Sequence, residues 1–469
     1  MKRTSLAQFL FATSVLCIAG LPAFAQEDAR PQLPPEERLQ ERRLQQENLQ
    51  EQRPEEERLQ DLRLQKGRFQ EERLRNPRDG HRVIGGTPLG QKKQLPAPPY
   101  PFKRMFTHGR LKDADARMEE ILGLSATATT LPFWNYSVVD PVDTNTYKGV
   151  MVGRSPFFHG HRATSTRVIL IPVKLTFMNG GLTFDPTTND GCSPLGTTPV
   201  MSLVQNSPIF QNSPYTMNGV NVGTTQYVDA FERANFWSDV SGTPYQTLLG
   251  SVTTLSAVSV TVPTASGSTA AGLCGNYGVI DINWWDPALN GGTGDGEAGV
   301  ILASVAAQGV GPTVLPIFVF DSVFMYIGTT ANCCILGYHN AFFTGGGAGP
   351  VQTYSVVSWD DSLVFDGDIS VTSHEVAEWM DDPLGTNPTP LWGMIGQVTG
   401  CQNNLEVGDP LSGILFTPVT LAGFAYNPQE LAFFSWFYGQ SPSLGAGGDY
   451  SNNISFKGFA KPCPPGGTN

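Results

Sequence analysis

The residues with the clearest chemical potential form an H-E-x-x-E pattern at His374, Glu375 and Glu378. If residues 369–380 are helical, His374 and Glu378 lie four residues apart and project from the same face, so one metal ion can contact both. Glu375 lies about 100° round the helix, where it can act as a general base on a metal-bound water. Zinc accepts imidazole and carboxylate ligands. The pattern therefore predicts a zinc site.

The residues after this pattern favour a cation but also allow structural roles. Asp381 returns to nearly the same helix face as the histidine, and Asp382 precedes Pro383, which is expected to end the helix. Carboxylates at a helix C-terminus oppose the macrodipole, so a nearby cation is favoured. Alternatively, the acids form a solvated helix face, or Thr372 and Glu375 form a capping box.

A catalytic zinc usually has three protein ligands and a water, so a third donor is required. Glu406 and Asp409 are the candidates, because both lie in a turn-rich segment that Cys401 can tether to the core. In the structural alternative, Gly408, Asp409 and Pro410 simply form a turn.

Further potential ligands lie elsewhere in the chain. Asp382 and His339 are additional candidates at the same centre, although His339 also fits a buried core histidine. His159 and His161 share one face if extended, but they lie among loop residues. Four acids lie in a Gly-rich stretch and could hold calcium, but their spacing matches no EF-hand loop, so turn formation is the favoured role. They are Asp281, Asp286, Asp295 and Glu297.

The elements that must position these residues predict an α+β fold with a mixed sheet. Residues 167–177 form a β-branched run typical of a central strand, with Pro172 near an edge or a bulge. Apolar spacing predicts helices at 113–122 and 226–237, and strands are expected at 131–139, 147–153, 251–263, 278–284, 313–326 and 353–359. Residues 354–357 are interpreted as an edge strand that offers its backbone to an extended substrate.

Composition divides the 469-residue chain into unlike parts. Residues 1–25 resemble a cleavable secretory signal, and no later window is apolar enough to span a membrane, so a secreted protein of the periplasm or the exterior is expected. Residues 26–82 form a Glu/Gln/Arg-rich arm, helical or disordered, followed by a linker at 83–130 and a globular domain at 131–469. The net charge of −12 provides no basic surface for nucleic acid.

The mature chain keeps six cysteines, and an even number in an exported protein predicts disulfides. Cys333 and Cys334 are adjacent, and a ring between neighbours is strained, so separate partners are expected for them. The remaining cysteines are Cys192, Cys274, Cys401 and Cys463.

The H-E-x-x-E segment, Asp382-Pro383, Trp392 and residues 406–409 resemble a pattern of the phosphate-induced, EXORDIUM-type secreted proteins and of a set of bacterial secreted proteins. Residues 151–157, 226–231, 337–339 and 433–437 resemble the bacterial set alone. The resemblance spans roughly 131–463 and implies a zincin-like fold. It also implies His374, Glu378 and either Glu406 or Asp409 as ligands, with Glu375 as base. Pro410 and Leu411 stand where the plant members often carry a cysteine.

These observations favour a secreted zinc peptidase that acts on protein or peptide substrates through a metal-bound water. A carboxylate in place of the second histidine adds negative charge and makes the zinc a poorer Lewis acid. The alternative is a catalytically inactive extracellular module that binds cell-surface material through the aromatic region 433–438. In a third interpretation, the arm has the main role, as a spacer or an interaction segment.

Overall fold

The computed structural model describes residues 105–108, 114–157, 162–189, 191–192, 197–290, 300–345, 347–365 and 368–463. The predicted signal, the arm and most of the linker lie outside these residues. The described secondary structure begins upstream of residue 131, with strand β1 (Met105–His108) and helix α2 (Met118–Ala126). None of the helices in the described residues combines the length and the apolarity that a membrane-spanning segment needs.

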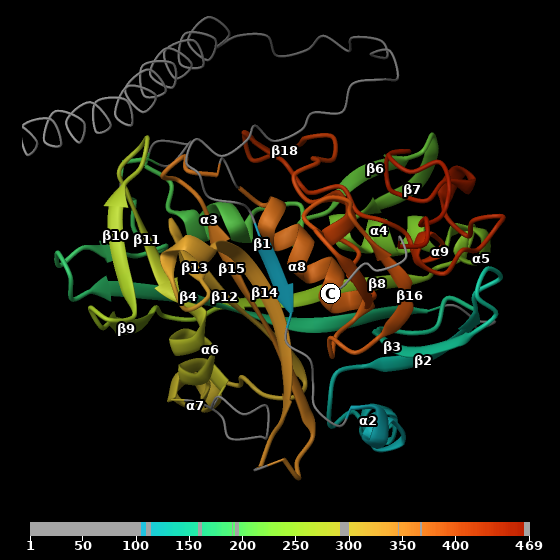
Figure 1. Ribbon diagram of the computed structural model, residues 1–469, viewed down its shortest axis with the longest axis horizontal. Helices are drawn as coiled ribbons and strands as arrows, with labels where there is room; N and C mark the ends of the chain where they lie inside the picture. The colour runs from blue at the N-terminus through green and yellow to red at the C-terminus, as the bar shows by residue number, and fades with distance from the viewer. Residues whose placement is uncertain are drawn as a thin grey trace, which may run out of the picture. The chain divides into compact units, whose positions relative to one another are not determined.

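An 11-stranded mixed sheet dominates the fold, which is α+β as predicted (Figure 1). The order along the sheet is β10-β11-β13-β14-β15-β12-β4-β5, while β1 pairs with β14 and both β8 and β9 pair with β4. These strands are β4 (Ala163–Phe177), β5 (Thr183–Phe184), β8 (Gln246–Thr254), β9 (Val258–Val262), β10 (Gly267–Ala271), β11 (Asn276–Asp281), β12 (Val314–Asp321), β13 (Val323–Tyr326), β14 (Cys333–Phe343) and β15 (Val351–Trp359).

Four two-stranded sheets and several short helices complete the fold. The small sheets pair β2 (Phe133–Val139) with β3 (Thr146–Val152), β6 (Ser213–Met217) with β7 (Val220–Thr225), β16 (Pro388–Gly393) with β17 (Cys401–Asn404), and β18 (Val419–Leu421) with β19 (Phe424–Tyr426). The remaining helices are α3 (Val200–Gln205), α4 (Tyr227–Asn235), α5 (Trp237–Val240), α6 (Ile282–Asn290), α7 (Val300–Ala306), α8 (Ser370–Asp381) and α9 (Phe434–Phe437), with 3-10 turns at Asp115–Arg117, Thr330–Asn332, Asp409–Leu411 and Ala446–Gly448.

Both faces of the central strand β4 are buried, because successive side chains of a strand point to opposite faces of a sheet. Val168 and Leu170 join the hydrophobic cluster that includes residues of α4 and α8. Ile169 and Ile171 join a second cluster with residues of α6 and α7. The sheet is therefore a layer between two helical groups, with α8 on one face and α6 and α7 on the other (Figure 1).

Of two predictions about strand position, that of an edge or a bulge at Pro172 is narrowed, and the other is wrong. Pro172 lies in the interior of the sheet, where β4 is paired with β12 on one side. On its other side, the pairing with β8 ends at Leu170 and the pairing with β9 begins at Val173, so the proline lies at the break between these two partners. The predicted edge strand at 354–357 is wrong, because β15 is paired with β14 on one side and β12 on the other.

The six cysteines form three disulfides, Cys192–Cys274, Cys333–Cys334 and Cys401–Cys463. The expectation of separate partners for Cys333 and Cys334 is wrong. The peptide bond between these two residues is cis, and their Cα atoms lie 3.0 Å apart, so the two sulfur atoms can meet. The Cys401–Cys463 disulfide ties β17 to the C-terminal segment. Further along the chain from β17, Gly408 and Asp409 donate backbone N–H groups to Glu378 of α8.

Candidate metal centre

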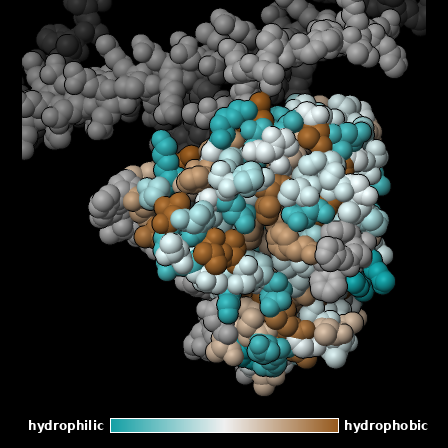
Figure 2. All heavy atoms as spheres, turned by 90° about the vertical axis from the view of Figure 1, so that its right-hand side faces the viewer, coloured by the Kyte–Doolittle hydropathy of each residue, from teal (hydrophilic) through white to brown (hydrophobic). Residues whose placement is uncertain are grey.

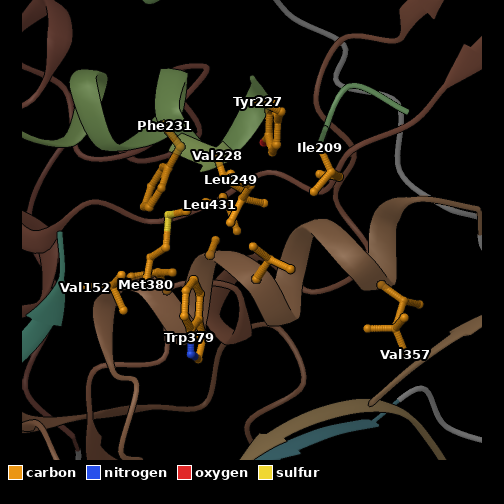
Figure 3. Close-up of a cluster of buried hydrophobic side chains, with 14 of the residues drawn as sticks. Val152, Ile209, Tyr227, Val228, Phe231, Leu249, Val357, Trp379, Met380 and Leu431 are labelled. Carbon is orange, nitrogen blue, oxygen red and sulfur yellow. The ribbon is translucent and has the colours of Figure 1, made fainter. Parts of the chain in front are cut away.

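Helix α8 carries the H-E-x-x-E residues, and its observed bounds, Ser370–Asp381, are within one residue of the predicted helix. The predicted capping box is wrong, because the N-cap is Ile369 and Thr372 lies inside the helix. All twelve residues of α8 are buried. In Figure 3, Met380 projects from α8 toward Phe231 of α4, and Trp379 projects to the opposite side, where its indole N–H donates to Thr353 of β15.

The polar face of α8 contributes to a first triad formed by His374, Glu378 and Asp409. The Nε2 atom of His374 lies 3.0 Å from Oε1 of Glu378 and 3.6 Å from Oδ1 of Asp409. Around a tetrahedral zinc with bonds of about 2.0–2.1 Å, ligand atoms stand roughly 3.3 Å apart. The triad therefore has the dimensions of a metal site. It also shows that Asp409, and not Glu406, joins the two helix residues.

A second triad consists of His339, Glu375 and Glu378. Nδ1 of His339 lies 3.5 Å from Oε2 of Glu375 and 3.9 Å from Oε2 of Glu378. The side chains of these three residues are at most 1% exposed. The fold thus contains two buried triads of His, Glu and Asp residues that can hold a metal ion, and Glu378 belongs to both triads.

Gly408 and Gln429 surround the ring of His374. A Cβ atom at Gly408 would lie 2.4 Å from Nδ1, so only glycine permits this approach. Gln429 Nε2 lies 2.9 Å from Nδ1 and donates to the Gly408 carbonyl at 2.8 Å. Nδ1 therefore accepts from the amide, and the ring proton is on Nε2. Coordination through Nε2 would place the proton on Nδ1 and turn the amide oxygen of Gln429 toward it.

Two predicted candidates, Glu406 and Asp382, have other roles. The Oε1 atom of Glu406 accepts a hydrogen bond from Asn404, and Glu406 belongs to neither triad. The carboxylate of Asp382 accepts from the backbone N–H groups of Thr386 and Asn387, which organise the turn after α8. Asp382 contributes to the centre through its carbonyl oxygen, which lies 3.1 Å from Nε2 of His339.

Burial controls the electrostatics of the centre, because it disfavours every charged form. It raises the pKa of Glu375 well above its usual range, and the carboxylates of Glu378, Glu406 and Asp409 raise it further. It raises the pKa of Glu378 strongly, and that of Asp409 to about 6. Burial lowers the pKa of His374 to about 4, so the ring is neutral at pH 7. A divalent cation would relieve this repulsion among carboxylates.

The other residues singled out in the sequence are either outside the described residues or have other contacts. His159, His161, Asp295 and Glu297 are outside the described residues. Asp281 accepts from the backbone N–H groups of Asn283 and Gly328. Asp286 accepts from the hydroxyls of Tyr338 and Tyr354, so both described acids have hydrogen bonds within the fold. The aromatic side chains of 433–438 are buried, at most 4% exposed, and pack the core instead of forming a binding surface.

Sequence reasoning missed Gln429 and the buried acid Glu232. Gln429 follows α8 by about fifty residues in a segment without a recognisable pattern. Glu232 lies on α4 and interacts with Asp381 at the end of α8, and one of its carboxylate oxygens has no hydrogen-bond partner in the described part of the chain. The helical spacing in 226–237 identifies Glu232 as a helix residue but does not show which element it faces.

The centre does not open directly to solvent. An open cavity of about 590 Å³ lies elsewhere, between the β2–β3 turn and the C-terminal segment, and it is lined by residues that include Tyr147, Leu391 and Phe459. Figure 2 shows one face of the molecule, on which apolar and polar side chains are interspersed without a dominant apolar area. The side chains of the two triads are at most 7% exposed.

Comparison with protein-family models, with curated proteins and with solved structures gave no match. The function therefore has to be inferred from the geometry and chemistry of the two triads.

Proposed function

We propose that this chain is a metal-dependent hydrolase of peptide bonds, with a zinc ion held by His374, Glu378 and Asp409. One observation carries the proposal. The helix presents His374 and Glu378 one turn apart, and Asp409 arrives from a separate segment with ligand-like spacing, 3.6 Å from the histidine. The imidazole favours zinc over calcium, which prefers oxygen ligands. An H-E-x-x-E helix packed on a mixed sheet also supports a zincin-like fold.

Zinc, when bound, supplies Lewis acidity that activates water and polarises a carbonyl group. The protein's own contribution is to position ligands and to move a proton. Glu375 lies in the same buried centre, and its raised pKa makes its carboxylate a better proton acceptor near neutral pH. Glu378 is held in place because its Oε1 accepts hydrogen bonds from the backbone N–H groups of Gly408 and Asp409.

The three disulfides and the signal-like first 25 residues support secretion as part of the same proposal. An extracellular or periplasmic hydrolase would meet protein and peptide substrates there. Such a substrate reaches the centre only when a covering segment moves. One segment beside the centre is β1, which pairs with β14 at Ile335–His339, next to the second triad.

The test is cleavage of a fluorescence-quenched peptide library by the secreted chain loaded with one equivalent of zinc. Wild type should cleave the library, and Glu375→Gln should bind the zinc but cleave nothing. Glu378→Ala should lose both the zinc and cleavage. Glu119→Gln, a change of the same chemistry at an exposed residue, is the control and should behave as wild type. Zinc-loaded wild type that cleaves no peptide contradicts the hydrolase proposal.

A second candidate function follows from the complete burial of the centre. An ion enclosed in this way can brace α8 against residues 406–409 in a non-enzymatic extracellular module. In that case the metal contributes only to stability. Chelation would then lower the melting temperature of a protein that cleaves nothing at any zinc concentration.

A further inference from the structure

Glu375 faces a second set of ligands that the proposed zinc does not use. Both of its carboxylate oxygens are buried and have no hydrogen-bond partner among the described residues. The carboxylate is directed toward β14, since a Cβ atom at Gly337 would lie 2.8 Å from Oε1 of Glu375. Oε2 lies 3.5 Å from Nδ1 of His339. A buried carboxylate without a donor is costly, so this position requires a positive charge or a proton.

The tautomer of His339 follows from its backbone contact. Nε2 lies 3.1 Å from the carbonyl oxygen of Asp382, and a carbonyl can only accept, so Nε2 carries the hydrogen. In the neutral ring, Nδ1 therefore presents its lone pair to Glu375 and Glu378. A histidine oriented by a hydrogen bond from its second nitrogen to a backbone carbonyl is typical of metal ligands. Three acceptor groups thus converge on one point.

Glu378 presents a different oxygen atom to each histidine. Oε1 lies 3.0 Å from His374, and Oε2 lies 3.9 Å from His339. A carboxylate with this orientation can contact two ions, one on each oxygen. Among the described residues, the ion-pair partners of Glu375, Glu378 and Asp409 are the two histidines. The carboxylate of Glu406 also acts on Glu375 and Glu378. When these acids are ionised and the rings are neutral, their negative charge exceeds what one divalent ion compensates.

We propose that His339, Glu375 and Glu378 form a second divalent-cation site, which shares Glu378 with the first. The inference rests on the proposed hydrolase function and adds a regulatory feature to it. The second ion takes the carboxylate of Glu375, so that Glu375 can no longer accept a proton. Hydrolysis should therefore rise with the first equivalent of zinc and fall when the second site fills.

The experiment counts zinc ions on the full secreted chain by elemental analysis after incubation with one to six equivalents of zinc and desalting. Wild type should reach two zinc ions per chain. His339→Ala should stop at one, because the first triad remains. Glu232→Gln, a buried acid on α4 that belongs to neither triad, is the matched control and should reach two. If circular dichroism shows that His339→Ala is unfolded, Glu375→Gln replaces it and should also stop at one.

The outcomes separate this inference from the proposed function. Wild type that saturates at one zinc, or His339→Ala that still binds two, overturns the second site. Saturation at one zinc with intact peptide cleavage overturns the second site alone and leaves the hydrolase standing. Two zinc ions in wild type and one in His339→Ala, without cleavage at any ratio, supports the second site and contradicts the hydrolase.

Discussion

Replacing Glu232 by glutamine should make the metal-free fold less sensitive to alkaline pH. Glu232 is buried on α4 and interacts with Asp381 of α8. Burial, followed by the charge of Asp229, raises the pKa of Glu232 to about 8. The folded state therefore holds this proton more tightly than the unfolded chain, where the pKa is near its ordinary value of 4.5. Glutamine imitates the protonated form and is neutral at every pH.

The size and sign of the effect follow from linkage. A rise in pKa from 4.5 to about 8 corresponds, at about 1.4 kcal/mol per pH unit, to a contribution of at most about 5 kcal/mol to the free energy of unfolding. Because the folded pKa is the higher one, this stability is fully present below pH 4.5 and is lost as the pH rises to about 8. Wild type should lose stability over this window, and Glu232→Gln should lose up to about 5 kcal/mol less. The other buried acids, such as Glu375 and Glu378, contribute to the loss in both proteins.

The assay is urea unfolding at pH 5, 6.5 and 8, followed by tryptophan fluorescence in the presence of a chelator. The chelator keeps the pH dependence of metal binding out of the comparison. The exposed acid Glu119 provides the control, and Glu119→Gln should stay within about 0.5 kcal/mol of wild type at each pH. Equal pH dependence in wild type and Glu232→Gln would show that Glu232 is not held protonated by the fold.

Three further predictions concern the metal centre. Gly408→Ala should displace the ring of His374, because the added Cβ would lie 2.4 Å from Nδ1; calorimetry should show about 1–3 kcal/mol of destabilisation, and elemental analysis a loss of zinc. Chelation of zinc present at about 100 times its Kd should lower the free energy of unfolding by about 2.7 kcal/mol, measured by urea titration, unless the ion binds the unfolded chain equally well. Phe106→Pro and Thr107→Pro each remove one backbone N–H donor of β1, which pairs with β14 beside the centre. Successive N–H groups of a strand point to opposite sides, so the variant that removes the donor facing β14 should speed the removal of zinc by a coloured chelator. Unchanged rates in both variants would show that β1 does not control access.

The residues of the H-E-x-x-E helix show how far sequence patterns reach. The spacing of His374 and Glu378 predicts that they share one helix face, and the structure confirms that their side chains lie 3.0 Å apart. The β-branched run at 167–177 predicts a central strand, and β4 confirms it. These predictions concern neighbours along the chain, whose relative positions depend on the periods of helix and strand. Such periods are visible in the sequence itself.

The pairing of Cys333 with Cys334 and the interior position of β15 could not be read in this way. A cis peptide bond leaves no mark in the residue types that flank it. Likewise, an apolar strand has the same pattern whether it is second from an edge or in the middle of a sheet, because both of its faces are buried in either case. The order of strands depends on which partners meet during folding.

The sequence by itself determined the helix, the residue types of a candidate metal centre and the central strand. Only the tertiary structure decided that Asp409 joins His374 while Glu406 does not, and that His339 of β14 lies beside Glu375. These contacts join segments that are separated by more than thirty residues, and they depend on the packing of α8 against the sheet and on the turn at Gly408. Local preferences carry no information about such distances, because they arise only when the whole core is assembled.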